Sequence, residues 1–211
     1  MNPVRNCLSE LYFLLSLVRQ YHAIVLASQS PRRQELLARI GVEDFKTLSL
    51  DIDESYPAGL SPEDTVRYIA GKKSEAAAAL CAPDDLIITA DTMVFLDNDR
   101  LGKPQDEEDA FRMLRELAGN RHTVCTGVSL RQGTRYESFA VSTGVYFRQA
   151  TDDEIRAYIK TGEPMDKAGA YGVQSRGALF VERIDGDFFN VMGLPVEQLG
   201  LALERFGVKL L

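Results

Sequence analysis

The chain has 211 residues, of which 45% are apolar, so it can bury one sizeable core in one domain or two closely joined lobes. Its net charge of −7 at pH 7 argues against nucleic acid polymers and anionic membranes as partners, because both require a basic surface, but it allows a small anion held by local cations. Cys7, Cys81 and Cys125 form no CxxC pair, which favours a reducing compartment over a disulfide framework or a zinc site.

Residues 1–22 are predicted to be an extension ahead of the folded domain. Their apolar run LYFLLSLV, at 11–18, is shorter than the about 20 residues that a membrane-spanning helix needs. Signal-peptide cleavage near RQYHA would abut or clip the first predicted strand. We therefore expect one domain over residues 23–211 and no membrane segment.

From residue 23 onward, apolar strands alternate with capped helices. Strands are predicted at 23–28, 45–50, 85–97 and 178–187, helices at 30–41, 61–80, 106–119, 151–162 and 195–207, and a β-hairpin at 122–149 that turns at Gly133. Gly41 is expected to cap the first helix, and Ser61 and Asp64 have capping-box spacing. This order of elements predicts an α/β fold with a mixed sheet.

The segment ASQSPRR joins the first predicted strand to the first predicted helix. Ser30 is expected at the N-cap and Pro31 at the first helical position. Arg32 and Arg33 then lie in the first turn, where the helix dipole repels cations. A bound phosphate would reverse that repulsion, because it accepts hydrogen bonds from free N–H groups and from guanidinium groups. The alternative is a pair of solvated arginines that contact acidic side chains such as Glu35.

Asp91 lies within the apolar run IITADTMVF. An unpaired buried carboxylate is costly, so this side chain needs a cation, a metal, a row of N–H donors or a place where the strand opens into a cleft. A carboxylate in such a place is a candidate general base or metal ligand. A structural aspartate bonded to a neighbouring loop is the alternative. Thr92 is either a ligand contact or a good strand former.

Three further stretches combine charge with flexible backbone. The segment DIDES places three carboxylates within four residues, which suits either a divalent metal or an acidic solvated loop. Lys72 and Lys73 are adjacent on the second helix, and Lys103 lies in the turn LGKPQ. Each of these lysines is either a phosphate contact or a solvated side chain. The glycine-rich loop 167–177 contains Gln174, whose amide offers the donor and the acceptor that recognition of a base edge requires.

Taken together and in this order, these segments resemble one family, the Maf-like nucleoside triphosphate pyrophosphatases. The matching pieces are LASQSPRR, DIDE, KK before SEAAA, TADTMV, LGKP, HTVCTGV, DKAGAYGVQ and GDFFNVMGLP. They extend from residue 23 to about residue 207. Members of this family usually lack an extension such as residues 1–22.

The resemblance implies a fold and a reaction. The fold is an α/β structure with a mixed twisted sheet, flanking helices and a deep central cleft, similar to inosine triphosphate pyrophosphatases. The reaction is hydrolysis of a nucleoside triphosphate between the α and β phosphates, which gives a monophosphate and pyrophosphate. Members use a divalent cation, Mg²⁺ or Mn²⁺, and are often homodimers in the cytoplasm.

The resemblance also assigns roles to residues of this chain. Asp91 matches the general base, and Glu54 is expected to share a metal with it. The positions that set base specificity in the branch acting on dTTP and UTP match Arg32, Thr92 and Gln174. The polar shell around the triphosphate matches Ser28, Arg33, Lys73 and Lys103.

Two rival interpretations stay open at this point. One is a regulator of cell division and septum formation that binds nucleotide without hydrolysing it. The other is a phosphatase of the haloacid dehalogenase type, because LSLDIDES faintly resembles the start of that motif with Asp51 as nucleophile and Asp53 as acid. The rest of that second pattern does not follow in the sequence.

Overall fold

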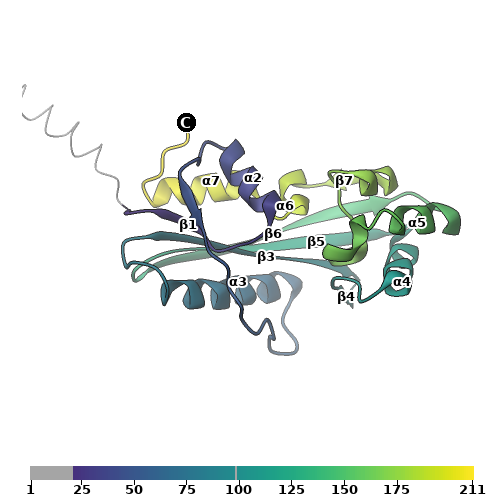
Figure 1. The fold of residues 1–211 in the computed structure, drawn as a ribbon, viewed down its shortest axis with the longest axis horizontal. Helices are drawn as coiled ribbons and strands as arrows, with labels where there is room; N and C mark the ends of the chain where they lie inside the picture. Colours follow the sequence, from purple (N-terminus) through teal and green to yellow (C-terminus); the bar gives the residue numbers. More distant parts are fainter. Residues whose placement is uncertain (1–20, 98) are drawn as a thin grey trace, which may run out of the picture.

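A computed structural model describes residues 21–97 and 99–211 and contains a mixed sheet of seven strands (Figure 1). The strands are β1 (Ile24–Leu26), β2 (Phe45–Thr47), β3 (Leu86–Leu96), β4 (Asp99–Leu101), β5 (Arg121–Gln132), β6 (Arg135–Phe147) and β7 (Val181–Asp185). They follow the order β2-β1-β3-β5-β6-β7, and β4 pairs with β3. β1 is parallel to β2 and β3, whereas the other pairs are antiparallel, so the predicted mixed sheet is confirmed.

Helices cover both faces of this sheet. They are α2 (Pro31–Arg39), α3 (Pro62–Ala78), α4 (Glu107–Leu117), α5 (Asp152–Ile159), α6 (Phe188–Met192) and α7 (Val196–Arg205), with short 3-10 turns η1 (Glu163–Asp166), η2 (Ala168–Ala170) and η3 (Arg176–Phe180). Figure 1 shows α3 along one face, α2, α6 and α7 along the other, and α4 and α5 at one end. None of the helices in the described residues is long and apolar enough to cross a membrane. The apolar run 11–18 lies outside the described residues.

Local capping signals set several of these boundaries. The N–H of Asp64 donates to Ser61 Oγ at the start of α3, over 3.1 Å. Thr151 and Glu154 satisfy one another's backbone N–H groups in a capping box at the start of α5. The hairpin between β5 and β6 turns at Gly133, as predicted, with a φ of 55° that favours glycine.

Three details differ from the sequence prediction. The C-cap of α2 is Ile40 and not the expected Gly41, which follows one residue later with a φ of 92°. The strand expected over 45–50 is restricted to Phe45–Thr47. The sequence predicted neither β4 nor α6, because elements of three and five residues carry too little periodicity to be recognised.

The pleat of β3 distributes its side chains between the two faces of the sheet. Ile88 and Val94 belong to the main core, whereas Met93 packs with Val66 of α3 on the opposite face. Neighbouring residues of a strand point to opposite faces, so Asp91 lies on the α3 side and Thr92 on the α2 side. The strand thereby supplies polar groups to both helices.

Helix α3 lies unusually close to the sheet at Gly127 of β5. A methyl group added at Gly127 would come 2.4 Å from the backbone carbonyl of Val66, so the two backbones are in direct contact. Gly127 is also the partner of Asp91 across the β3–β5 ladder. Lys73 lies about two helical turns beyond Val66 and contacts Asp91, so this close approach positions the lysine relative to the carboxylate.

Candidate active site

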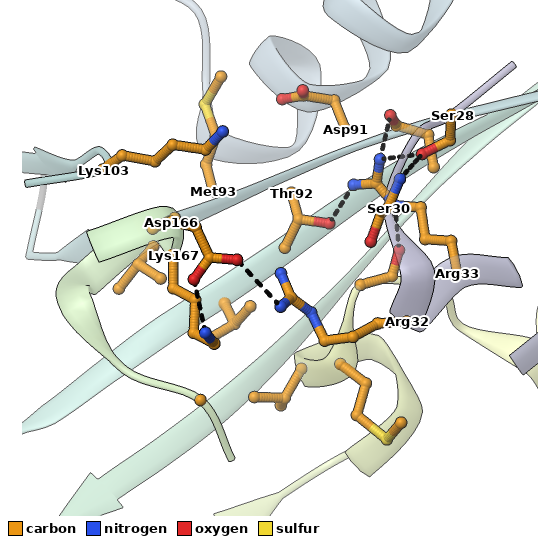
Figure 2. Close-up of a pocket in the computed structure, with 18 of the residues that line it drawn as sticks. Ser28, Ser30, Arg32, Arg33, Asp91, Thr92, Met93, Lys103, Asp166 and Lys167 are labelled. Atoms are coloured by element: carbon orange, nitrogen blue, oxygen red, sulfur yellow. Dashed lines mark hydrogen bonds and ion pairs between the residues drawn. The ribbon is translucent and has the colours of Figure 1, made fainter. Parts of the chain in front are cut away.

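A cavity of about 670 Å³ opens around the N-terminus of α2 and the middle of β3. Its wall is completed by the turn after β4, the loop after η1 and the end of α6 (Figure 2). The nine residues predicted for the site all line it: Ser28, Arg32, Arg33, Glu54, Lys73, Asp91, Thr92, Lys103 and Gln174. The fold therefore brings together groups that the chain distributes between residues 28 and 174.

Lys73 joins the two carboxylates of this cavity. Its Nζ lies 2.7 Å from Asp91 Oδ1 and 2.9 Å from Glu54 Oε1. The side chains of Asp91 and Lys73 are 9% and 14% exposed, whereas that of Glu54 is 48% exposed. Two carboxylates thus converge on one point at the border between the protein interior and the cavity.

The second carboxylate oxygen of Asp91 is buried and has no hydrogen-bond partner within the described residues. Burial of such an atom is costly unless another group satisfies it. Carboxylate oxygens are the ligands that Mg²⁺ and Mn²⁺ prefer, and Glu54 supplies a second carboxylate beside the same lysine. The donor set formed by Asp91 and Glu54 therefore fits a divalent cation.

Arg33 is largely committed to the protein itself. Its Nε donates to the carbonyl of Gly193 over 2.8 Å, Nη1 donates to the carbonyl of Ala90 and to Ser28 Oγ, and Nη2 donates to Thr92 Oγ1 over 2.9 Å. Burial lowers the pKa of Arg33, and the charge of Asp91 opposes that shift. Four of the five guanidinium N–H groups thus fasten α2 to β3 and to the end of α6, which leaves one for a ligand.

The hydroxyl of Thr92 connects Arg33 to a series of hydrogen bonds that runs from β3 across β5 to β6. Thr92 Oγ1 lies 3.0 Å from Thr126 Oγ1, and Thr126 donates to the backbone carbonyl of Asn190 over 3.0 Å. The amide of Asn190 donates in turn to Thr143 Oγ1 and to a β5 carbonyl. These hydrogen bonds hold α6 against β5 and β6.

Arg32 points away from Arg33, toward the loop on the other wall of the cavity (Figure 2). Its Nη1 lies 3.8 Å from Asp166 Oδ2, and Asp166 also pairs with Lys167 over 2.6 Å. Lys103 extends into the same view from the turn after β4 and has no salt bridge within the described residues. Ser30 forms no side-chain cap, and the first turn of α2 holds no acidic residue, so its free N–H groups lie at the cavity.

The haloacid dehalogenase interpretation is not supported by this geometry. Asp53 is exposed, accepts hydrogen bonds from Ser55 and pairs with Lys72 over 3.5 Å. Neither Asp51 nor Asp53 lines the cavity. Of the three clustered carboxylates, Glu54 alone reaches the site.

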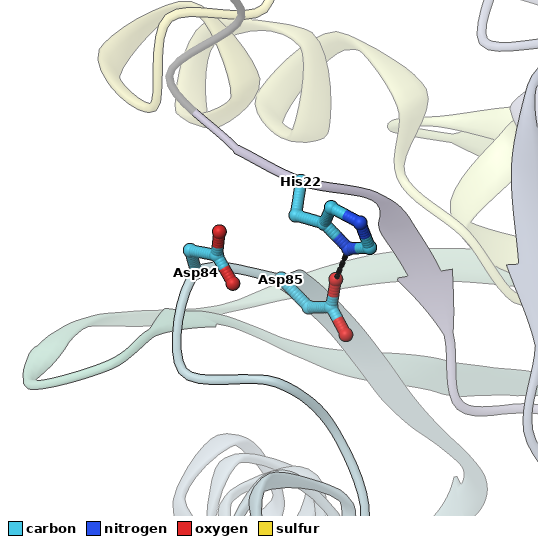
Figure 3. A group of neighbouring side chains, drawn as sticks. All are labelled: His22, Asp84 and Asp85. Carbon is cyan, nitrogen blue, oxygen red and sulfur yellow. Dashed lines mark hydrogen bonds and ion pairs between the residues drawn. The ribbon is translucent and has the colours of Figure 1, made fainter.

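A second group of carboxylates lies apart from the cavity, just ahead of β1 and β3 (Figure 3). His22, Asp84 and Asp85 each place one ligand atom within 4.8 Å of the others. Asp85 Oδ1 lies 3.2 Å from His22 Nδ1, and Asp85 Oδ2 accepts the N–H of Ala82 over 2.9 Å. These bonds tie the turn before β3 to the start of β1, which is a structural role.

The family of Maf-like proteins matches residues 23–206. The chain belongs to the Maf-like family.

Two curated relatives of this Maf-like chain carry the same name. A dTTP/UTP pyrophosphatase from Bacillus velezensis is 47% identical to it, covering 88% of this chain and 97% of the relative. A dTTP/UTP pyrophosphatase from Bacteroides thetaiotaomicron is 45% identical, covering 84% of this chain and 93% of the relative. A solved HAM1 protein from Coxiella burnetii matches with a TM-score of 0.51 and 13% identity, covering 87% of this chain and 98% of that chain. That likeness confirms the predicted fold class.

Sequence reasoning missed several cavity residues of the Maf-like chain. Asp166, Tyr171 and Gly193 line the cavity but were assigned no role. They lie in DKAGAYGVQ and NVMGLP, two of the segments that carry the family resemblance, so that resemblance was the available signal. The contacts of Asp166 with Arg32 and of Gly193 with Arg33 depend on tertiary packing, which no local pattern encodes.

Proposed function

We propose that this chain is a nucleoside triphosphate pyrophosphatase that hydrolyses dTTP and UTP between the α and β phosphates, releasing the monophosphate and pyrophosphate. The observation that carries the proposal is Asp91, a buried carboxylate at the cavity with one oxygen that lacks a partner. Relatives of 45% to 47% identity named dTTP/UTP pyrophosphatase support the substrate assignment.

Asp91 is proposed as the general base that removes a proton from the attacking water. Its Oδ1 is fixed by Lys73, which leaves Oδ2 available for this work. Asp91 and Glu54 would also hold Mg²⁺ or Mn²⁺, which would supply positive charge to the phosphates and to the pyrophosphate leaving group. Lys73 keeps the two carboxylates together by contacting both.

The triphosphate is proposed to lie between the N-terminus of α2 and Lys103. The free N–H groups of the first turn of α2 and the hydroxyl of Ser28 offer donors to phosphate oxygens. Lys103 adds a flexible ammonium, and the remaining N–H of Arg33 adds one further donor. These cations explain how an acidic protein binds a polyanion.

The pyrimidine base is proposed to contact Arg32, Thr92 and Gln174. The side chain of Gln174 is exposed and belongs to a cavity-lining loop, so the carbonyl and the NH₂ of its amide are both accessible to a base edge. A site that pairs the polar groups of one base rejects a base that leaves those groups unpaired. Thr92 orients Arg33 in addition, through the hydrogen bond described above.

The assembly and the compartment are proposed from the family resemblance. We infer a homodimer in the cytoplasm, with the catalytic domain over residues 23–211 and residues 1–22 as an N-terminal extension. Size-exclusion chromatography with light scattering should give twice the mass of the 23.5 kDa chain. A monomer at micromolar concentration would contradict the dimer alone.

A nucleotide panel tests the proposed reaction. The purified protein with Mg²⁺ or Mn²⁺ should release pyrophosphate from dTTP and UTP faster than from CTP, ATP or GTP, and a chelator should abolish the release. Modified pyrimidine triphosphates belong in the same panel. Equal rates on all five nucleotides would contradict the specificity, and orthophosphate as the first product would contradict the reaction.

A further inference from the structure

The loop that carries Gln174 closes on itself at a narrow neck. A methyl group added at Gly177 would lie 2.6 Å from the carbonyl oxygen of Gly172, so the two ends of the segment 172–177 touch through their backbones. Ser175 donates its N–H to the carbonyl of Gly172 over 3.5 Å. Gln174 lies at the tip of this segment and lines the cavity.

One carboxylate outside the predicted site fills that neck. Glu163, in η1, accepts the hydroxyl of Ser175 over 2.6 Å and the N–H of Gly177 over 3.2 Å on Oε1. Its other oxygen accepts the N–H of Arg176 over 3.3 Å. Three consecutive residues that follow Gln174 therefore donate to one side chain.

Tyr158 of α5 secures the other side of the neck. Its hydroxyl donates to Glu163 Oε1 over 2.7 Å and accepts the N–H of Gly172 over 3.1 Å. Glu163 and Tyr158 together hold both arms of the loop and leave only Val173 and Gln174 between the anchored residues.

The carboxylate of Glu163 is held by hydrogen bonds and not by a cation. Within residues 21–97 and 99–211, no salt bridge joins it to an arginine or lysine side chain, and Lys167 contacts only its backbone carbonyl. Burial raises the pKa of Glu163, but the hydrogen bonds from Ser175, Tyr158 and the loop backbone outweigh burial and lower it overall. The charge of Glu163 is thus satisfied by neutral donors of this loop and of Tyr158.

We propose that Glu163 is a positioning residue for substrate selection, which uses the neck of the loop 172–177 to hold Gln174 at the cavity wall. The inference rests on the proposed function, because Gln174 matters as a contact to the base. Glu163 lines no part of the cavity itself and therefore acts through the loop. Loss of the anchor should weaken recognition of the base while the groups around Asp91 stay in place.

Glu163→Gln tests this proposal with steady-state kinetics on UTP, dTTP and ATP. It keeps the size of the side chain but removes the charge and one of the accepting oxygens. We expect KM for UTP to rise about tenfold and the preference for UTP over ATP to fall by a similar factor, with kcat changed less than about threefold. Tyr158→Phe should change the same quantities in the same direction, by a smaller factor.

Glu154→Gln is the matched control, because Glu154 lies on α5, is also bonded to an N-cap and contacts only Arg148 and Thr151. Its KM and selectivity should equal those of the wild type. Amide hydrogen exchange of residues 172–177 should accelerate in Glu163→Gln and Tyr158→Phe but not in the control.

Two results would overturn the inference while leaving the proposed function intact. One is unchanged exchange in the loop of both variants, and the other is faster exchange with unchanged KM and selectivity. A wild-type protein that releases no pyrophosphate from any nucleotide is a different result, which overturns the proposed function and the inference with it.

Discussion

Two buried aspartates of the β3 region, Asp85 and Asp91, differ in how their oxygens are satisfied. Each residue is 6% exposed. Both oxygens of Asp85 have partners, His22 and the N–H of Ala82, whereas Asp91 has Lys73 on one oxygen and none on the other within the described part of the chain. Burial alone therefore does not identify a functional carboxylate. What sets Asp91 apart is an unmatched oxygen beside a cavity.

The two aspartates also lie at different places along the parallel strands. Asp85 and His22 precede β3 and β1, where they join the entries of two neighbouring strands (Figure 3). Asp91 lies within β3, level with the residues that follow β1 and open α2. Ligands of α/β proteins bind beyond the carboxyl ends of parallel strands, which is the side that Asp91 occupies.

Asp91→Asn gives the largest expected effect of the comparison. It should reduce pyrophosphate release by ~10²- to 10⁴-fold, because the amide cannot accept the proton of the attacking water. Isothermal titration should still detect nucleotide binding. Asp85→Asn is the matched control and should keep nearly full activity; near-normal turnover by Asp91→Asn would reassign the base.

Asp85→Ala tests the other side of the comparison through stability. Removal of this buried carboxylate takes away the acceptor of the Ala82 N–H and the partner of His22, so the free energy of unfolding should fall by about 0.5–1.5 kcal/mol. Urea denaturation measures this change. His22→Ala should cost less than about 0.5 kcal/mol, because the side chain of His22 is 63% exposed. A loss of activity without a loss of stability in Asp85→Ala would contradict the structural role.

His122 extends the comparison to a buried group with an unmatched atom that does not line the cavity. Its Nε2 bonds to Tyr171 over 2.8 Å, and its Nδ1 has no partner among the described residues. Burial, aided by the charge of Arg121, lowers the pKa of His122 from 6.5 to about 3. The unfolded chain therefore binds one more proton between those pH values, so this part of the stability is complete above pH 6.5 and is lost as the pH falls toward 3.

The free energy of unfolding measured between pH 7 and pH 5 tests this expectation. His122 should contribute a slope of ~1.4 kcal/mol per pH unit below pH 6.5, and His122→Gln should remove that contribution. Equal slopes in both proteins would show that His122 takes up no proton on unfolding in this range.

The sequence predicted the long elements of the fold because their local signals agree. The apolar run of β3, the hairpin turn at Gly133 and the caps at Ser61 and Thr151 each need only neighbouring residues. The prediction failed for short elements such as α6, whose position depends on the bond from Thr126 to Asn190. Periodicity cannot encode a contact between residues so far apart in the chain.

The candidate site likewise contains residues that a local sequence signal reveals and residues whose contacts depend on the tertiary structure. Asp91 was recognisable because a charged residue interrupts an apolar run. The commitment of Arg33 to Gly193 and Ala90 was not, because a sequence does not tell whether an arginine meets a phosphate or a carbonyl oxygen. The role of Glu163 was hidden for the same reason, since the groups that donate to its carboxylate come together only in the folded loop 172–177.

Gly127 shows how a residue without a side chain can help to position a cavity side chain that it never touches. It is absent from the cavity wall, yet the contact between its backbone and Val66 seats α3 at the depth from which Lys73 meets Asp91. A methyl group at Gly127 would push α3 away from the sheet and move the Lys73 ammonium away from Asp91. A mutational survey confined to cavity-lining positions would overlook this backbone contact between α3 and β5.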